Sequence, residues 1–217
     1  MRLSVVIPTL DAATHLADTL EAVRGADEIL VVDGGSADAT VAIAETEGAR
    51  VLAAPRGRGA QLRAGGEAAR GEWLLFLHAD TRLDSDWREA AAAHIARRPE
   101  APACFRFRLD DPAWQARVIE RGVTARVRLL GLPYGDQGLL VPRALYERVG
   151  GFRPLPLMED VDLVRRLGRP DVLAADAVTR AGRWRKDGWF ARSARNLFCL
   201  LLYRLGVPAE RVAALYG

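Results

Sequence analysis

The sequence predicts an α/β protein in which a mainly parallel sheet is flanked by helices. Four short apolar runs in the first 80 residues are bounded by turn-forming residues, and helical patterns separate them. Such alternation is typical of βαβ units. Three of the runs end in carboxylates or small polar groups, and ligands of open α/β sheets bind outside the carboxyl ends of the strands.

The first half of the chain contains the predicted parallel strands. Each run is short, apolar and closed by a turn signal, as expected for a strand that is buried on both faces. Pro8 closes the first run, and apolar residues at helical spacing from Ala12 to Val23 predict the helix that follows it. The four predicted strands are residues 3–7, 29–32, 50–53 and 73–77.

The second half has a different pattern. Residues 105–109 alternate between apolar and polar side chains, which predicts a half-exposed strand. Residues 114–130 predict an amphipathic helix rich in arginine. A turn-rich loop over 132–138 precedes the apolar residues 139–141, and three carboxylates open a helix at Glu159.

Composition bounds the class of protein. A chain of 217 residues, half of them hydrophobic, suits one domain with or without a C-terminal extension. The net charge is +3, with −5 in residues 1–120 and +8 in 121–217. A basic second half suits an anionic ligand or an anionic membrane surface, whereas the interleaved basic and aromatic strips of a nucleic-acid binder are missing. Two distant cysteines predict buried thiols.

Targeting signals are absent from the pattern. The chain runs from Met1 directly into a strand, so we expect no signal peptide. The apolar run 197–203 is far shorter than the roughly 20 residues that span a bilayer. We therefore expect a cytoplasmic protein. Residues 190–205 form an amphipathic helix whose apolar side packs on the core, the reading we favour, or docks on the inner face of a membrane.

The strand that ends before His78 and Asp80 carries the clearest candidate site. Two residues apart in an extended chain, the imidazole and the carboxylate point the same way and could meet a metal ion. The alternative is that Asp80 caps the next helix. Asp11 and Asp33 follow two other strands, so we expect a cleft lined by acidic groups.

Glycines and a basic cluster complete the candidate site. Gly34 lets a ligand approach the backbone after its strand, and the helix start around Arg58 offers N–H groups and a guanidinium to an anion. Leu62 stands where a dinucleotide fingerprint needs glycine, and no P-loop motif occurs. Asp160 is a candidate general base if it is partly buried. The basic residues of 180–186, with Trp184 among them, either hold a diphosphate or form a solvated surface.

Five segments in order resemble the family 2 glycosyltransferases of the GT-A fold, over nearly the whole chain. SVVIPTLDAATHLADTLEAV is similar to that family's first strand and helix, and VVDGGSADAT to its VDDGSxDxT segment. LLFLHADTRL stands where the family has its DxD-type motif. GDQGLLVPRALYERVGGF and PLMEDVDLVRRL resemble its acceptor-side loop and ED motif. The HAD variant and GDQG are most like a short bacterial subgroup.

The resemblance implies an inverting transfer of a sugar from a nucleotide-diphosphate sugar, with a UDP-sugar favoured, to an acceptor hydroxyl. Asp80 would coordinate Mn²⁺ or Mg²⁺ on the diphosphate, and Asp160, with Glu159 beside it, would be the general base. It also implies one domain, with a nucleotide-binding half 1–99, an acceptor half 100–186 and a helical extension 187–217. The positions implied to bind the nucleotide sugar are Pro8, Thr9, Asp11, Asp33, Gly34, Arg58, His78, Gly135, Asp136, Gln137, Arg183 and Trp184.

Two departures from the family pattern concern the metal. The first Asp of the DxD motif is His78 here, which either bonds the ribose, ligates a softer ion such as Mn²⁺, or is a buried non-ligand. Many relatives supply a late histidine to the metal, but this chain has none after His94. Arg183 and Trp184 resemble an arginine-tryptophan element of some relatives and could compensate.

Two other functions compete with the transferase. A sugar-phosphate nucleotidyltransferase can share the sheet and the metal aspartate, but residues 8–15 lack its glycine-rich loop and Lys186 is the only lysine. A catalytically silent nucleotide-binding module is the third reading. The presence of Asp33, Asp80 and Asp160 argues against it.

Overall fold

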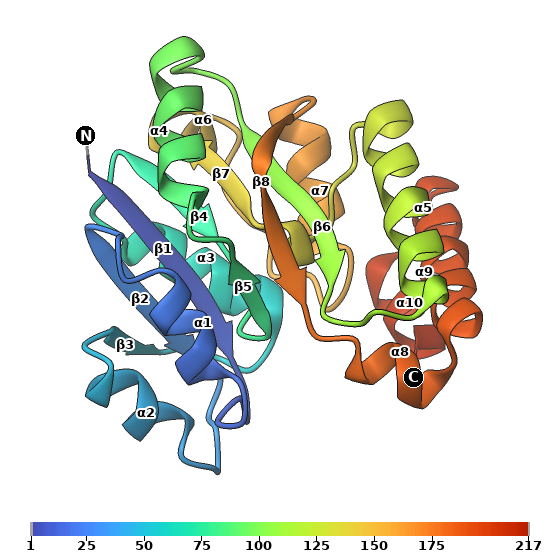
Figure 1. Ribbon diagram of the computed structural model, residues 1–217, viewed down its shortest axis with the longest axis horizontal. Coiled ribbons are helices and arrows are strands. Elements are labelled where there is room, and N and C mark those ends of the chain that lie inside the picture. Colours follow the sequence, from blue (N-terminus) through green and yellow to red (C-terminus); the bar gives the residue numbers. More distant parts are fainter. Residues whose placement is uncertain (1, 217) are drawn as a thin grey trace.

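One mixed sheet of eight strands runs through the protein, whose computed structural model describes residues 2–216 (Figure 1). The strand order is β3-β2-β1-β4-β7-β6-β8-β5. The strands are β1 (Leu3–Thr9), β2 (Glu28–Asp33), β3 (Arg50–Ala53), β4 (Trp73–Phe76), β5 (Thr81–Leu83), β6 (Ala103–Leu109), β7 (Leu139–Pro142) and β8 (Asp171–Thr179).

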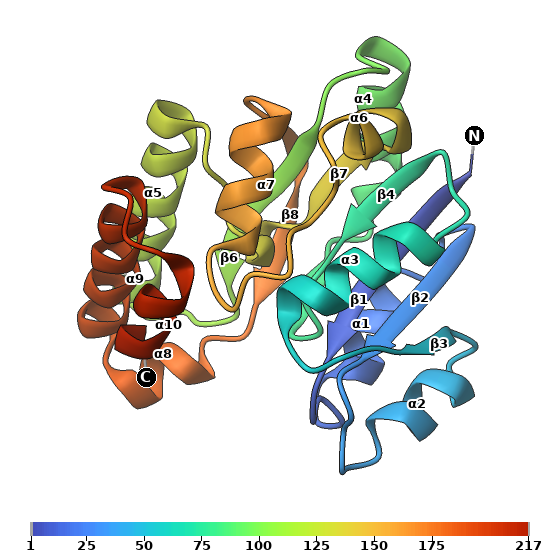
Figure 2. The ribbon, with the colours of Figure 1, turned by 180° about the vertical axis from the view of Figure 1, so that it is seen from behind.

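Helices cover both faces of this sheet and extend it at one end (Figures 1 and 2). They are α1 (Leu16–Ala22), α2 (Thr40–Thr46), α3 (Arg58–Ala68), α4 (Trp87–Arg97), α5 (Trp114–Leu130), α6 (Arg143–Arg148), α7 (Glu159–Leu167), α8 (Gly182–Asp187), α9 (Trp189–Arg204), α10 (Ala209–Tyr216) and the 3₁₀ turn η1 (Gly135–Gln137). Helices α5, α8, α9 and α10 gather beyond β6 in both views.

Side chains alternate along β1, so this strand contributes to an apolar core on each face of the sheet. Val5 and Ile7 belong to an apolar cluster with residues of α1 and α4, whereas Val6 belongs to a second cluster with residues of α3, α6 and α7. All three side chains are fully buried. A strand buried on both faces therefore reads as a continuous apolar run, as the sequence predicted.

The predicted α/β class is confirmed, and the sheet is more mixed than expected. Strands β1 to β4 pair in parallel. β7 pairs antiparallel with both β4 and β6, and β5 pairs antiparallel with β8, while β6 and β8 are parallel. Strands β5 and β8 were not predicted: β5 has only three residues, and the alternating DVLAADAVT of the nine-residue β8 carries few bulky residues.

Two local expectations and one alternative were wrong. β1 continues through Pro8 to Thr9, because β2 pairs with it as far as Thr9. Pro8 is tolerated there because β4 pairs with β1 only as far as Val6. α1 begins at Leu16 rather than at residue 12, after a tight turn. Asp80 does not cap a helix, since β5 follows it directly.

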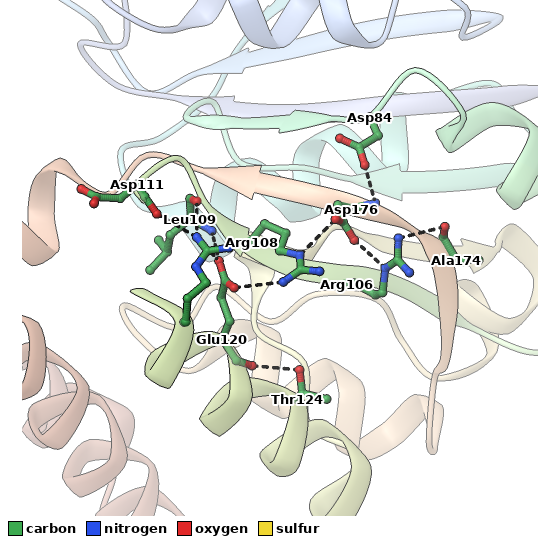
Figure 3. Close-up of polar contacts among 10 residues, drawn as sticks. Asp84, Arg106, Arg108, Leu109, Asp111, Glu120, Thr124, Ala174 and Asp176 are labelled. Atoms are coloured by element: carbon green, nitrogen blue, oxygen red, sulfur yellow. Dashed lines mark hydrogen bonds and ion pairs between the residues drawn. The ribbon is translucent and has the colours of Figure 1, made fainter. Parts of the chain in front are cut away.

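Arginine–carboxylate contacts hold the second half of the sheet together (Figure 3). The Asp176 carboxylate on β8 accepts from Arg106 Nε at 2.5 Å and from Arg108 Nε at 3.1 Å, both on β6. Glu120 of α5, which is buried, accepts from Arg108 Nη1 at 3.0 Å and from the Leu109 N–H at 2.9 Å. This network fixes α5 and the carboxyl end of β8, and so places α8 beside the sheet edge.

Two adjacent helices expose large apolar side chains. Within residues 2–216 no helix is long and apolar enough to cross a bilayer. On α5 and α9, however, Trp114 contacts Phe190 with ring centroids 5.9 Å apart, and both are more than half exposed. The apolar surface, as we call it, consists of Trp114, Val118, Leu129, Phe190, Leu197, Phe198 and Leu201. Both cysteines are buried free thiols, as predicted.

Candidate active site

A cavity of about 710 Å³ lies at the carboxyl ends of β1 and β4, where the sequence placed the site. Its walls come from the ends of those strands, from the start of α3 and from the segment that joins β8 to α8. The predicted residues that line this larger cavity are Pro8, Thr9, Asp11, Arg58, His78, Asp80 and Arg183. Five arginines line it beside three aspartates, so the expectation of an acidic cleft was wrong.

The loop after β2 is tied to the end of β1 by carboxylates that bind backbone groups. Asp33, which is buried, accepts from the N–H groups of Gly35 and Ser36, each at 2.9 Å, and from Thr9 Oγ1 at 3.1 Å. Burial alone would raise the pKa of Asp33, but these hydrogen bonds and one from the Ser36 hydroxyl outweigh it and lower the pKa. Asp11 Oδ1 accepts from the Ala37 N–H at 2.8 Å. Asp33 therefore lies behind the cavity wall.

Gln61, which sequence analysis missed, completes this wall. Its Nε2 donates to the carbonyl oxygens of Thr9 at 2.7 Å and Val32 at 2.8 Å, so one buried amide holds two strand ends together. A Cβ on Gly34 would lie about 3.1 Å from that amide. The lack of a side chain at Gly34 therefore allows Gln61 to pack closely against it. Gly34 does not line the larger cavity.

Arg58 joins the starts of two helices. Its Nε donates to Glu159 Oε1, and the Glu159 side chain is fully buried while that of Arg58 is 37% exposed. Burial raises the pKa of Glu159, and the charge of Arg58 opposes that rise. Helix α3 can approach the segment 153–155 closely because it carries Gly59 there. A Cβ at this position would meet the backbone of that segment. Glu159 thus lies beneath the site and lines neither the larger cavity nor its neighbour.

A second, smaller cavity of about 150 Å³ adjoins the first. The two share four lining residues, which are Arg58, His78, Asp80 and Arg183. Asp136, Asp160 and Trp184, predicted from sequence, line the smaller cavity. The side chains that sequence analysis missed come largely from the C-terminal helices and the loops before η1 and α7; they are Tyr134, Leu157, Met158, Thr179, Arg192, Asn196 and Tyr216.

Asp160 is oriented by two backbone donors. Its Oδ2 accepts from the Gly135 N–H at 2.8 Å, and its Oδ1 accepts from the N–H of Val161 at 2.7 Å. A Cβ on Gly135 would overlap the His78 ring, so only glycine fits there. Burial and the nearby charge of Arg58 lower the pKa of His78 to about 4, and the imidazole is therefore neutral near pH 7. Loop 132–138 thus positions the carboxylate through the Gly135 N–H, a contact that the sequence did not predict.

Asp136 and Gln137 in η1 have different roles in the structure. Burial raises the pKa of Asp136 to about 6, because the nearby Arg126 does not offset the burial and the charges of Asp160 and Asp80 add to it. Gln137 is buried and donates to the Phe105 carbonyl at 3.1 Å, so it fastens η1 to β6 and reaches neither of the two cavities.

The basic cluster of 180–186 faces the larger cavity with three of its guanidinium groups, from Arg180, Arg183 and Arg185. Arg180 is bound to Asp18 at 2.5 Å, and Arg185 is bound to Asp111. Arg183 is 70% exposed and has Asp80 as its nearest carboxylate, with 4.0 Å between Nη2 and Oδ2. Its guanidinium is thus available to a ligand.

A metal ion at this site would have Asp80 as its protein ligand. Among residues 2–216, no three His, Cys, Asp or Glu side chains form a metal-binding cluster. Asp80 is part-buried and lines both cavities, and within the described part of the chain its counter-ion is the distant Arg183. A single carboxylate fits Mg²⁺ or Mn²⁺ held mainly by phosphate oxygens and water, but it does not fit an ion held by the protein alone.

Backbone strain also lies at the site. Among the described residues, two that are not glycine have a positive φ: Asp11, at 49°, and Met158, at 64°. The first lines the larger cavity and the second lines the smaller one, directly before Glu159 and Asp160. Left-handed conformations at non-glycine residues cost free energy and cluster at functional sites.

The eight-stranded mixed sheet, with two joined cavities at one edge, can be compared with known proteins. The model of the family described as Glycosyl transferase family 2 matches residues 4–153, more than half of the chain. The protein therefore belongs to glycosyl transferase family 2, and the resemblance found in its sequence is confirmed at this level.

Curated relatives match part of the chain. A PGL/p-HBAD biosynthesis glycosyltransferase of Mycobacterium bovis is 36% identical over 104 residues, which cover 42% of this chain and 41% of that protein. An uncharacterized glycosyltransferase of Rickettsia felis is 33% identical over 90 residues, covering 41% of this chain and 32% of the relative. The chain thus spans about two fifths or less of the length of these relatives.

Solved structures match the whole fold. TarS 1-349 of S. aureus in complex with UDP-GlcNAc has a TM-score of 0.65 and 17% identity, covering 100% of this chain and 70% of that chain. Glucosyl-3-phosphoglycerate synthase of Mycobacterium tuberculosis, in complex with Mn²⁺, UDP and glucosyl-3-phosphoglycerate, has a TM-score of 0.64 and 21% identity, covering 95% and 81%. These likenesses show a GT-A-like fold.

Proposed function

We propose that this protein transfers a sugar from a UDP-sugar to an acceptor hydroxyl with inversion at the anomeric carbon. One observation carries the proposal: two cavities meet at Asp80, and Asp160 lies on the smaller one only. A donor in the larger cavity would thus present its sugar toward a separate carboxylate. The UDP-GlcNAc bound by TarS and the UDP bound by the synthase support a UDP-linked donor.

The larger cavity would hold the nucleotide diphosphate. Thr9 and Asp11 lie at its β1 end, where the base and ribose would bind, and Asp33 would act by holding the loop behind them. Asp80 would hold Mn²⁺ or Mg²⁺, which when bound neutralises charge on the departing diphosphate. The exposed guanidinium of Arg183 would contribute positive charge on the same side.

Asp160 would remove the proton from the acceptor hydroxyl as that oxygen attacks the anomeric carbon. The N–H groups of Gly135 and Val161 hold the carboxylate in one orientation, which a positioned general base requires. Attack from the side opposite the diphosphate inverts the anomeric carbon. Glu159 would be a positioning residue, because it reaches the site only through Arg58.

A thermal-shift screen of nucleotide-sugars with Mn²⁺ tests the donor, since a bound ligand raises apparent stability. We expect UDP-sugars to raise the melting temperature. Calorimetry with UDP and Mn²⁺ then tests the metal residue: Asp80→Asn should weaken binding, whereas the exposed Asp86→Asn should not. Unchanged binding by the Asp80 variant would remove Asp80 from the metal role.

We further propose that the apolar surface rests on an anionic bilayer at the inner face of the membrane. The exposed arginines Arg121, Arg128 and Arg204 lie on the same two helices, so their charge complements anionic lipid. The protein should sediment with phosphatidylserine vesicles, less so in high salt and not with phosphatidylcholine alone. Leu197→Ser with Leu201→Ser should abolish sedimentation. A stable dimer in solution with no vesicle binding would contradict the proposal.

A further inference from the structure

Buried polar atoms without a partner are concentrated around the smaller cavity. In residues 2–216, ten buried side-chain nitrogen or oxygen atoms lack a hydrogen-bond partner. Five of the ten belong to residues that line this one cavity, and they are Tyr134 Oη, Asp136 Oδ1, Trp184 Nε1, Arg192 Nε and Asn196 Oδ1. The residues come from η1 and its preceding loop, from α8 and from α9, so no single element accounts for them.

Such atoms are costly unless something binds them. A buried donor or acceptor that is left unsatisfied costs about 1–3 kcal/mol, and native proteins keep few of them. Their concentration around one cavity is the ground for inferring a ligand there, whose polar groups would supply the partners once the side chains rotate toward it. The set contains the donor Trp184 Nε1, the acceptor Asp136 Oδ1 and a phenol that can be either. Hydroxyl groups both donate and accept, and they match such a mixed set.

The charges around the cavity disfavour an anionic ligand. Asp136 and Asp160 both line it, and deprotonated phosphate or carboxylate oxygens could not donate to them. Two of the three guanidinium groups there are already engaged, Arg58 with Glu159 and Arg192 with Asp187 at 2.6 Å. The third, Arg183, is next to Asp80 on the boundary with the larger cavity.

The size and the apolar part of the wall suit a single ring. A volume of about 150 Å³ is half or less of the roughly 300–1,000 Å³ typical of pockets for drug-sized ligands. Met158 and Leu157 lie in the wall beside the aromatic rings of Trp184 and Tyr134. Aromatic and apolar side chains pack against the C–H faces of a ring while polar groups bind its edge.

We propose that the smaller cavity binds the acceptor as an uncharged, hydroxylated ring, whose hydroxyl groups are bound by Asp136 and Trp184 and reach Asp160. This inference rests on the proposed transferase function and adds the chemical class of the acceptor. Asp136 and Trp184 then determine acceptor specificity, while Asp160 performs the proton transfer.

UDP release from the UDP-sugar selected by thermal shift tests the proposal. With no acceptor, slow release reports transfer to water. We expect D-glucose or myo-inositol to accelerate release by at least about tenfold, and phosphoglyceric acid, the anionic probe, not to do so. Asp136→Asn and Trp184→Phe should each raise the KM of the neutral probe about tenfold, as the loss of one hydrogen bond to a buried group predicts. Asp86→Asn, at an exposed position that lines neither cavity, is the matched control and should leave this KM unchanged.

The possible failures are distinguishable. If no UDP-sugar binds, the proposed function fails, whatever the probes do. If a UDP-sugar binds and phosphoglyceric acid alone accelerates UDP release, or if neither neutral ring does, the acceptor class proposed here is wrong. Unchanged KM in both the near-isosteric Asp136→Asn and the Trp184→Phe variant would remove these residues from acceptor binding.

Discussion

The larger and the smaller cavity are built in different ways. The larger one is walled mainly by strand ends and the loops that follow them, so its shape is a property of the sheet. The smaller one is walled by side chains gathered from segments between Arg58 and Tyr216, with the C-terminal helices α9 and α10 on one side. The first design suits a ligand common to a family, and the second suits a ligand that differs between its members.

The two cavities also differ in how far their polar groups are satisfied. Around the larger one, Asp33 and Asp11 already hold backbone N–H groups. Around the smaller one, Asp136 and Trp184 keep atoms without partners. The proposed donor side is therefore organised before anything binds, whereas the proposed acceptor side would be completed by its ligand. Substitutions that act on one side only can test this difference.

The largest effect is expected from Asp160→Asn. The amide keeps the size of the side chain but cannot take a proton, so we expect turnover to fall by about 10²–10⁴-fold. UDP affinity should stay near the wild-type value, since Asp160 lies outside the larger cavity. Turnover and calorimetry measure the two quantities, with exposed Asp86→Asn as the control. Equal turnover would exclude Asp160 as the base.

Arg58 connects the two cavities, so we expect its removal to lower the free energy of unfolding. Arg58→Met leaves Glu159 buried without its counter-charge, and we expect the free energy of unfolding to fall by about 2 kcal/mol. Adding Glu159→Gln should recover part of the loss, because no unpaired charge then remains. Urea denaturation measures both variants.

The control for this pair lies on the same helix. Arg63 and Glu67 form an exposed ion pair, with 2.9 Å between Nε and Oε1, and such pairs contribute little. Arg63→Met should therefore change the free energy of unfolding by less than about 0.5 kcal/mol. Equal losses of unfolding free energy in Arg58→Met and Arg63→Met would mean that the buried pair does not stabilise the site.

The same contrast explains what the sequence could reveal. Thr9, Asp33 and Asp80 were found because they follow apolar runs, and parallel strands must bring such ends to one edge. Whether a carboxylate there faces the cavity or the loop behind it depends on rotamers and backbone donors, which periodicity does not encode. Asp33 was therefore placed at the right strand end, while its inward orientation was missed.

The acceptor side was harder to predict because its residues share no pattern. Trp184 stood out only as an indole among arginines. Asn196 lies on a helix that the sequence marked merely as amphipathic, and Tyr216 lies in the expected helical extension without a pattern of its own. They meet because α8, α9 and α10 gather beside α5, beyond β6. Glu159 shows the converse: next to Asp160 in sequence, it points to Arg58 and away from both cavities.

Gly135→Ala should perturb the boundary between the cavities. The added Cβ would overlap the His78 ring and push it toward the donor, which overpacking makes costly. We expect UDP affinity to fall about tenfold, equivalent to about 1.4 kcal/mol. His78→Ala in the same chain should relieve the clash and recover part of the affinity. Gly122→Ala, where a Cβ meets nothing within 4 Å, is the control. Additive losses in the double variant would contradict the steric account.

The smallest expected effect is on the pH dependence of the free energy of unfolding, and it arises from Asp136 in the smaller cavity. Between pH 4 and 6, Asp136 keeps its proton in the native protein, because its folded-state pKa is about 6. In the unfolded chain its pKa is near 3.8, so the same carboxyl is already ionised over that range. The native state then binds more protons between pH 4 and 6, so the free energy of unfolding falls as pH rises through that range. Two pKa units correspond to at most about 3 kcal/mol, and screening at this part-exposed position reduces the change to about 1 kcal/mol. His78, whose pKa is lowered to about 4, contributes a change of opposite sign in wild type and variant alike, so the two proteins have to be compared. Urea denaturation with EDTA present, at pH 4.5 and 6.5, should show that the free energy of unfolding of Asp136→Asn, relative to wild type, rises by about 1 kcal/mol between the two pH values. An equal pH dependence in both proteins would place the titrating group elsewhere, and the unsatisfied state of the smaller cavity would then have to be explained without Asp136.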